Sequence, residues 1–206
     1  MKPIMKLYFA PETCSFSPHI VLHELGLPFD LVKVNNQTKQ TSDGEDFLTI
    51  NPKGYVAALQ LTNGEVLTEG VAILQYLADL KPEAGLAPIN GSWERVRLQE
   101  MLNFITSEIH AGLSPLFNVE IPEEVKQVFK AKLNKRFDQI ENTLQRHDYL
   151  LGDAFTVADA YLFTVLQWTR FFAIDLSGWP GIAAYLARIR VRPSVQAALQ
   201  REAVFH

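Results

Sequence analysis

The chain has 206 residues, 48% of them hydrophobic, and a net charge of −4, which suits one large domain or two small ones. Its basic residues form no long run, which argues against the phosphate neutralisation that nucleic-acid binding requires. No apolar stretch is long enough to span a bilayer and no secretory signal is evident, so we expect a cytoplasmic protein that binds neither nucleic acid nor membrane.

The first eighty residues alternate between strand patterns and helix patterns. A short apolar strand is followed by a polar segment, and Pro18 then suits the first turn of a helix. Asn63-Gly64 supplies the positive φ angles of a type I′ turn, so the runs on either side should pair as an antiparallel hairpin. The predicted order is βαβαββα, with strands at 5–9, 29–34, 58–61 and 65–67 and helices at 18–25, 45–50 and 71–80.

Proline and glycine are concentrated at 81–91, which we predict to be a linker. Helical patterns fill the rest of the chain, and one of them, at 157–172, is apolar nearly all round, as in a buried central helix. Thr156 and Asp159 have the spacing of a capping box at its start. Further helices are predicted from the apolar spacing between Leu98 and Ile109 and over 122–146, 180–190 and 194–202.

Cys14 is the first side chain with a chemical role to consider. It is the chain's single cysteine, which excludes an internal disulfide and a multi-cysteine metal site, and we predict no metal. It lies in a polar loop just before a helix, where free N–H groups and the helix dipole favour an anion and lower the pKa of a thiol. Either its own thiolate or that of a bound thiol would be stabilised there, whereas an inert core cysteine fits the polar sequence PETCSFSP poorly.

Two further segments could hold a peptide. NPKGYVA at 51–57 precedes the hairpin, and Thr68-Glu69-Gly70 opens a helix with free N–H donors beside a carboxylate. No second cysteine stands at CxxC spacing, so a thiol partner would have to come from solution. Together these features offer what a zwitterionic peptide thiol needs.

Several segments resemble the beta-class, bacterial glutathione S-transferases: PETCSFSPHIVLHELG, NPKGYVAAL, LTEGVAILQYLAD, LNFITSEIH and FTVADAYLFTVLQW. The resemblance covers nearly the whole chain. It implies a two-domain α+β fold, with a thioredoxin-like glutathione-binding domain at 1–81, a linker at 82–91 and an all-helical domain at 92–206. It also implies a homodimer and glutathione as co-substrate.

The resemblance assigns roles around the glutathione sulfur and its glycyl end. Cys14 and Ser15 would face the sulfur, with the hydroxyl or backbone N–H of Ser15 donating to the thiolate. Lys39 would pair with the glycyl carboxylate. The backbone of Val56 would form strand-like hydrogen bonds with the cysteinyl unit, a β-addition mode of peptide capture.

It also assigns roles at the γ-glutamyl end and at the electrophile. Glu69 would receive the γ-glutamyl amino group, and the N–H of Gly70 would donate to the α-carboxylate. Asn103 and His110 are seven residues apart, which places them on one face of a helix. In the family these two residues lie over the sulfur and the electrophile site.

The chain departs from the family at Ala57, where the transferases have a cis proline after the valine. A cis peptide before a residue other than proline costs about 2.5–4 kcal/mol. Either the cis form is kept at that cost, or the peptide is trans and the contact from Val56 is displaced.

The implied function is conjugation of the glutathione thiol to small hydrophobic electrophiles, as in detoxification. A mixed disulfide of Cys14 with glutathione would add disulfide or peroxide reduction. Two alternatives remain open at this point: a noncatalytic binder of hydrophobic compounds weakened by Ala57, and a dedicated thiol-disulfide enzyme.

Overall fold

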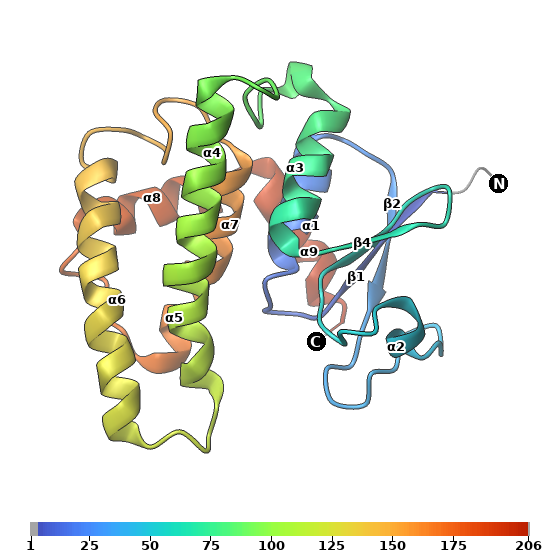
Figure 1. Cartoon of the computed structure of the whole chain (residues 1–206), viewed down its shortest axis with the longest axis horizontal. Coiled ribbons are helices and arrows are strands. Elements are labelled where there is room, and N and C mark those ends of the chain that lie inside the picture. The colour runs from blue at the N-terminus through green and yellow to red at the C-terminus, as the bar shows by residue number, and fades with distance from the viewer. Residues whose placement is uncertain (1–3, 206) are drawn as a thin grey trace. The chain divides into compact units, whose positions relative to one another are not determined.

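The computed structural model describes residues 4–205, and its strands form one mixed sheet in the order β2-β1-β3-β4 (Figure 1). The central strand β1 is parallel to β2 and antiparallel to β3, and β3 is antiparallel to β4. This is the predicted βαβαββα order, and the hairpin at Asn63-Gly64 is confirmed. The strands are β1 (Met5–Phe9), β2 (Phe29–Lys33), β3 (Ala58–Gln60) and β4 (Val66–Thr68).

Side chains of β1 alternate between the two faces of the sheet. Tyr8 packs against Phe47 of α2 (Phe47–Ile50), in a buried cluster that also contains Val32. Phe9 packs on the other side, near His19 of α1 (Phe16–Glu24). Helices α3 (Gly70–Leu80) and α9 (Pro193–Ala203) pack beside α1, so the sheet is covered by helices on both faces (Figure 1).

The compact units divide the chain differently from the predicted domains. One unit contains residues up to Ala84 and also those from Arg192 onward, whereas the other is Gly85–Val191. Helix α9 joins the sheet unit through polar contacts with α1: His19 Nδ1 lies 2.9 Å from an oxygen of the buried Glu202, and Arg192, the N-cap residue of α9, donates to Glu24. The predicted helical domain at 92–206 had assigned α9 to the other unit.

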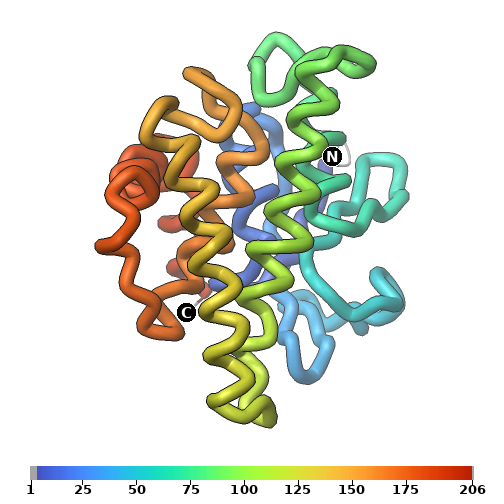
Figure 2. The backbone as a smooth tube through the Cα atoms, turned by 60° about the vertical axis from the view of Figure 1, so that its left-hand side comes forward, coloured from blue at the N-terminus to red at the C-terminus, as the bar shows by residue number. Residues whose placement is uncertain are grey.

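The second unit is helical, and no helix among residues 4–205 is long and apolar enough to cross a membrane. Figure 2 shows α4 and α6 side by side, and α7 is buried along its whole length. Its elements are α4 (Trp93–Phe104), a π-helix (Ile105–His110), α5 (Ala111–Leu113), a 3-10 helix (Ser114–Phe117), α6 (Glu123–Leu144), α7 (Val157–Leu166), a 3-10 helix (Gln167–Phe172) and α8 (Pro180–Arg190).

Two helices depart from the predicted regular pattern. The α-helix that begins at Val157 becomes a 3-10 helix after Leu166, and α4 passes into a π-helix. Hydroxyl groups bond backbone carbonyls at both places: Thr169 Oγ1 donates to Leu166 O, and Thr106 Oγ1 donates to Leu102 O. Such bonds compete with the regular helical ladder, which favours local changes of helix type.

The capping box at the start of α7 is confirmed. The backbone N–H and the hydroxyl of Thr156 both donate to the Asp159 carboxylate, at 2.8 Å and 2.9 Å. These bonds satisfy groups that a helix N-terminus leaves unpaired. They fix where the buried central helix begins.

Candidate glutathione site

A hydroxyl network holds the turn between β1 and α1. Thr13 Oγ1 donates to Ala10 O at 2.8 Å and lies 2.7 Å from Ser15 Oγ. Ser15 is fully buried, and its hydroxyl exchanges further bonds with the backbone of Ala10. The Ser15 hydroxyl thus closes the loop instead of being free to donate to a bound thiolate, as the resemblance implied.

Cys14 lies in this turn, and its side chain contacts the segment before β3. Its thiol is 3.4 Å from the carbonyl oxygen of Val56, to which it donates. Burial raises the pKa of Cys14 to about 11, and the charge of Glu69 adds to the rise. Backbone N–H groups of Cys14 and Ala57 act in the opposite direction but do not outweigh desolvation.

The expectation that the helix N-terminus lowers the pKa of Cys14 is therefore wrong. At neutral pH this residue is a thiol, which donates a hydrogen bond and is a poor nucleophile. Of the two sulfur anions considered from the sequence, the raised pKa argues against that of Cys14 itself.

The NPKG segment forms a tight structure next to Cys14. The Val56–Ala57 peptide is cis, which decides between the two forms considered from the sequence. Lys39 reaches this segment from the loop after β2, because its Nζ donates to Gly54 O at 2.9 Å and lies 5.7 Å from the centre of the Tyr55 ring. The structure thus brings Lys39, Val56 and Cys14 to one region of the sheet unit.

Glu69 is held in an unusual backbone conformation at the start of α3. Its φ of 69° and ψ of 110° lie where residues other than glycine are rare, at a cost of about 1–3 kcal/mol. It makes no side-chain cap, so the first N–H groups of the helix, beginning with Gly70, receive no bond from it. Its exposed carboxylate instead lies 2.7 Å from Lys53 Nζ, a contact that the sequence did not predict.

His110 and Asn103 lie in the helical unit. His110 Nδ1 is 2.6 Å from the Tyr161 hydroxyl, its ring packs edge-on against Trp168, and burial lowers its pKa. Asn103 is exposed and donates to Gln99 O at 2.9 Å. The π-helix at Ile105–His110 changes the turn between Asn103 and His110, so the regular spacing that predicted a shared face does not hold.

Aromatic side chains that the sequence analysis did not single out surround His110. Phe117 packs against Trp168 at 5.5 Å and against Phe172 at 4.6 Å between ring centres. Together with Tyr161 they form an aromatic cluster in which Tyr161 and Trp168 are buried and Phe117 is exposed. The sequence did not predict the cluster, because Phe117 and Tyr161 are far from the other members along the chain. The sequence does show several aromatic residues at 168–172.

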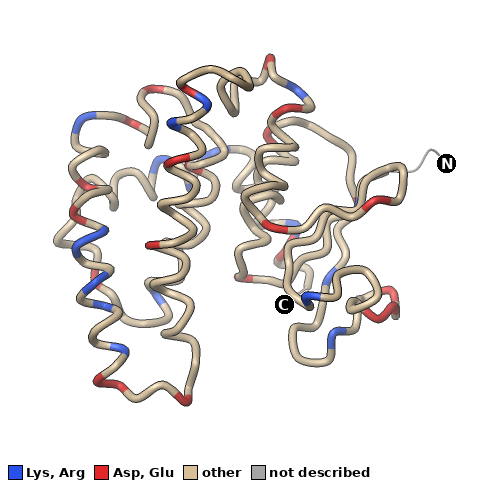
Figure 3. The backbone as a smooth tube through the Cα atoms, in the orientation of Figure 1, with Lys and Arg blue, Asp and Glu red and all other residues tan. Residues whose placement is uncertain are grey.

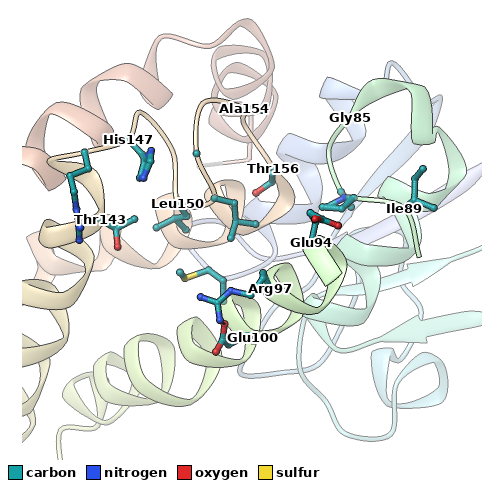
Figure 4. Close-up of a pocket in the computed structure, with 16 residues that line it drawn as sticks. Gly85, Ile89, Glu94, Arg97, Glu100, Thr143, His147, Leu150, Ala154 and Thr156 are labelled. Atoms are coloured by element: carbon teal, nitrogen blue, oxygen red, sulfur yellow. The ribbon is translucent and has the colours of Figure 1, made fainter. Parts of the chain in front are cut away.

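The helical unit also contains a cavity of about 750 Å³ between α4, the end of α6 and the loop before α7. In Figure 4, Arg97 and Glu100 lie on the α4 side and His147 and Thr143 on the opposite side, with Leu150 between them. Its lining does not include any predicted site residue, so it is not part of the predicted glutathione site.

Acidic and basic positions are interspersed along α6 (Figure 3). Within residues 4–205, no three histidine, cysteine, aspartate or glutamate side chains are grouped as metal ligands would be.

Comparison with known proteins identifies the family. Residues 13–80 match the N-terminal domain of glutathione S-transferases, and residues 104–193 match their C-terminal domain. The chain is 45% identical to glutathione S-transferase GstA of Escherichia coli O157:H7 over 199 residues, which covers 96% of this chain and 98% of that protein.

Solved structures of glutathione S-transferases support the same family. A sphingomonad glutathione S-transferase complexed with glutathione superposes with a TM-score of 0.93 at 43% identity. The beta-class glutathione S-transferase of Sphingomonas chungbukensis gives 0.92 at 45% identity, and each comparison covers 96% of this chain and 98% of the other. The chain therefore belongs to the glutathione S-transferase family, and to its bacterial beta class.

Proposed function

We propose that this protein is a glutathione transferase that joins the thiol of glutathione to small hydrophobic electrophiles. The observation that carries the proposal is the neutral Cys14 thiol at the start of α1, beside Val56 and within the field of Glu69. The Cys14 S–H donates to Val56 O in this structure and would turn to a second sulfur once the tripeptide is bound. The family membership identifies the second sulfur as that of glutathione.

Binding of the tripeptide would use groups along one edge of the sheet unit. The Glu69 carboxylate would take the γ-glutamyl ammonium, and the N–H of Gly70 would donate to the neighbouring carboxylate. The Val56 backbone would pair with the cysteinyl unit. Lys39, which already reaches the NPKG segment, would take the glycyl carboxylate.

The reaction begins with loss of the glutathione thiol proton to solvent. The resulting thiolate is stabilised by the Cys14 S–H and by the positive end of α1. It then attacks an electrophilic carbon, so that a C–S bond forms while a halide leaves or an unsaturated carbon gains a proton. By the roles that the family assigns, His110 and Asn103 would act on the electrophile.

The other readings of the sequence receive less support. The raised pKa of Cys14 makes it a slow nucleophile at neutral pH, so reduction through a mixed disulfide would be a minor activity. A noncatalytic binder is not favoured, because the similar proteins are named transferases. A dedicated thiol-disulfide enzyme would reduce disulfides in a Cys14-dependent way and show no conjugation at all.

We also propose a cytoplasmic homodimer acting in detoxification, as in the family. Exposed apolar side chains on α4, among them Trp93 with 69% of its surface exposed and Val96, are consistent with a surface that a second subunit covers. Light scattering coupled to gel filtration measures this directly. A monomer at micromolar concentration would contradict the dimer without touching the proposed activity.

Replacing Glu69 with glutamine tests the proposed binding mode. We expect the Kd for glutathione to rise about 10- to 100-fold, because a charge-assisted hydrogen bond to the γ-glutamyl ammonium becomes a neutral one. Calorimetry measures the Kd, and conjugation of a chloronitrobenzene measures kcat and KM. Glu65→Gln is the matched control, since Glu65 is exposed on the hairpin and should not affect binding. Equal effects of the two substitutions would contradict the assignment.

Replacing Cys14 tests the sulfur contact. In Cys14→Ala we expect the pKa of the bound glutathione thiol to rise by about one to two units, because one donor to the thiolate is lost. Cys14→Ser keeps a donor and should change it less. The ultraviolet absorbance of the thiolate, titrated with glutathione bound, reports this pKa. An unchanged pKa in the alanine variant would assign the stabilisation to the helix N-terminus alone.

A further inference from the structure

Lys53 occupies the position where the γ-glutamyl end of glutathione is expected. Its Nζ lies 2.7 Å from a Glu69 carboxylate oxygen and 3.3 Å from Thr68 Oγ1. Its side chain is 58% exposed and that of Glu69 is 69% exposed, so both are open to a ligand from solvent. The ammonium group of Lys53 thus already neutralises the carboxylate that is to receive another ammonium group.

The backbones that carry the two charges are fixed. Glu69 is the N-cap residue of α3, and its φ is 69°. Lys53 is held in the NPKG turn by Asn51, a buried residue whose side chain accepts from the N–H of Lys53 and donates to the Tyr55 carbonyl. The two charged side chains therefore extend from the N-terminus of α3 and from a hydrogen-bonded turn.

Breaking the contact between Lys53 and Glu69 costs little. Exposed ion pairs typically contribute about 0–1 kcal/mol to stability. The Lys53 ammonium can therefore give way to a ligand ammonium and remain nearby. The pair then offers one negative and one positive group, which matches the ammonium and carboxylate carried on the α-carbon of a γ-glutamyl unit.

We propose that Lys53 is a glutathione-binding residue that contacts the γ-glutamyl α-carboxylate, while Glu69 takes the α-ammonium. This inference rests on the proposed function and adds to it a residue that recognises one charge of the substrate. Gly70 has no side chain and offers the carboxylate only its N–H, so Lys53 supplies the positive charge that the carboxylate otherwise lacks. The competing possibility is a surface ion pair that stabilises Glu69 and never touches the ligand.

Ligand analogues separate these two roles. Glutathione is compared with γ-aminobutyryl-cysteinylglycine, which lacks the α-carboxylate, and with glutaryl-cysteinylglycine, which lacks the α-ammonium. In Lys53→Met we expect the Kd for glutathione to rise about tenfold and the Kd for the decarboxylated analogue to stay the same. Binding of the deaminated analogue should also weaken, because it keeps the carboxylate that Lys53 contacts.

Two further variants serve as controls. Lys53→Arg keeps the positive charge and should restore most of the preference for glutathione. Lys135→Met removes one exposed lysine from α6 in the helical unit and should change none of the constants. The variants lie at exposed positions, so thermal unfolding is expected to show each one folded.

The outcomes are distinct. If Lys53→Met weakens glutathione and the decarboxylated analogue equally, or weakens neither, Lys53 does not contact the carboxylate and the inference is overturned while the proposed function stands. If the wild-type protein binds none of the three peptides, the proposed function fails and the inference fails with it.

Discussion

Asp159→Ala is expected to lower the free energy of unfolding by about 3–5 kcal/mol. The Asp159 carboxylate is fully buried and accepts hydrogen bonds from the N–H groups of Leu150 and Thr156 and from the Thr156 hydroxyl. The Tyr185 hydroxyl lies 3.2 Å away. Alanine would leave these donors buried without their acceptor and would remove the capping box from the central helix.

The loss corresponds to a Tm about 10 °C lower for a chain of this size. Differential scanning calorimetry at one fixed protein concentration measures it. Asp153→Ala is the control, because Asp153 is an exposed aspartate in the same loop region, and it should shift Tm by no more than about 2 °C. Equal shifts in the two variants would show that the network does not stabilise the fold as argued.

Local sequence signals predicted much of the fold. Asn63-Gly64 marked the hairpin because few residues tolerate its backbone angles, and Thr156 with Asp159 marked the start of α7 because the spacing of a capping box is short. In both cases the determining interactions lie within a few residues. The boundaries of α1 and α7 were less accurate, since helix ends depend on bonds such as that of the Thr169 hydroxyl.

The site was predicted less completely, because its chemistry depends on contacts between distant segments. The position of Cys14 before a helix was visible, but its desolvation against Val56 was not, and desolvation reverses the expected direction of its pKa. The Ser15 hydroxyl was expected to donate to the glutathione thiolate, yet it is hydrogen-bonded to the Thr13 hydroxyl within the loop. The pairing of Lys53 with Glu69 joins residues sixteen apart in the sequence.

The contact between α1 and α9 was the largest omission. His19 is fully buried, and its Nδ1 lies 2.9 Å from an oxygen of Glu202, which is far along the chain. Nothing within either helix predicts this contact, because its two members are 183 positions apart in the sequence. The arrangement has a measurable consequence for stability in acid.

Acidification is expected to destabilise the sheet unit through His19 and His23. Burial, with a contribution from Arg201, lowers the pKa of His19 to about 3, and burial, His19 and Arg201 lower the pKa of His23 to about 4. Protonation would place a proton on Nε2, which in each ring is buried without a hydrogen-bond partner among the described residues. Both rings are thus neutral in the folded protein.

Because the folded pKa values lie below the unfolded value near 6.5, the unfolded chain binds protons first as the pH falls. The stability that the neutral rings provide is complete above about pH 6.5 and is lost progressively as the pH falls towards 4 and 3. At pH 5 the loss is about 2 kcal/mol for His19 and smaller for the more exposed His23. His19→Asn keeps a donor for Glu202 but cannot titrate, so its unfolding free energy, measured by urea denaturation, should be lower at pH 7.5 and should fall less steeply between pH 6.5 and 5. His147→Asn, in an exposed loop, should keep the wild-type slope. If His19→Asn keeps that slope as well, other groups cause the acid sensitivity, and His19 carries its proton in the folded state.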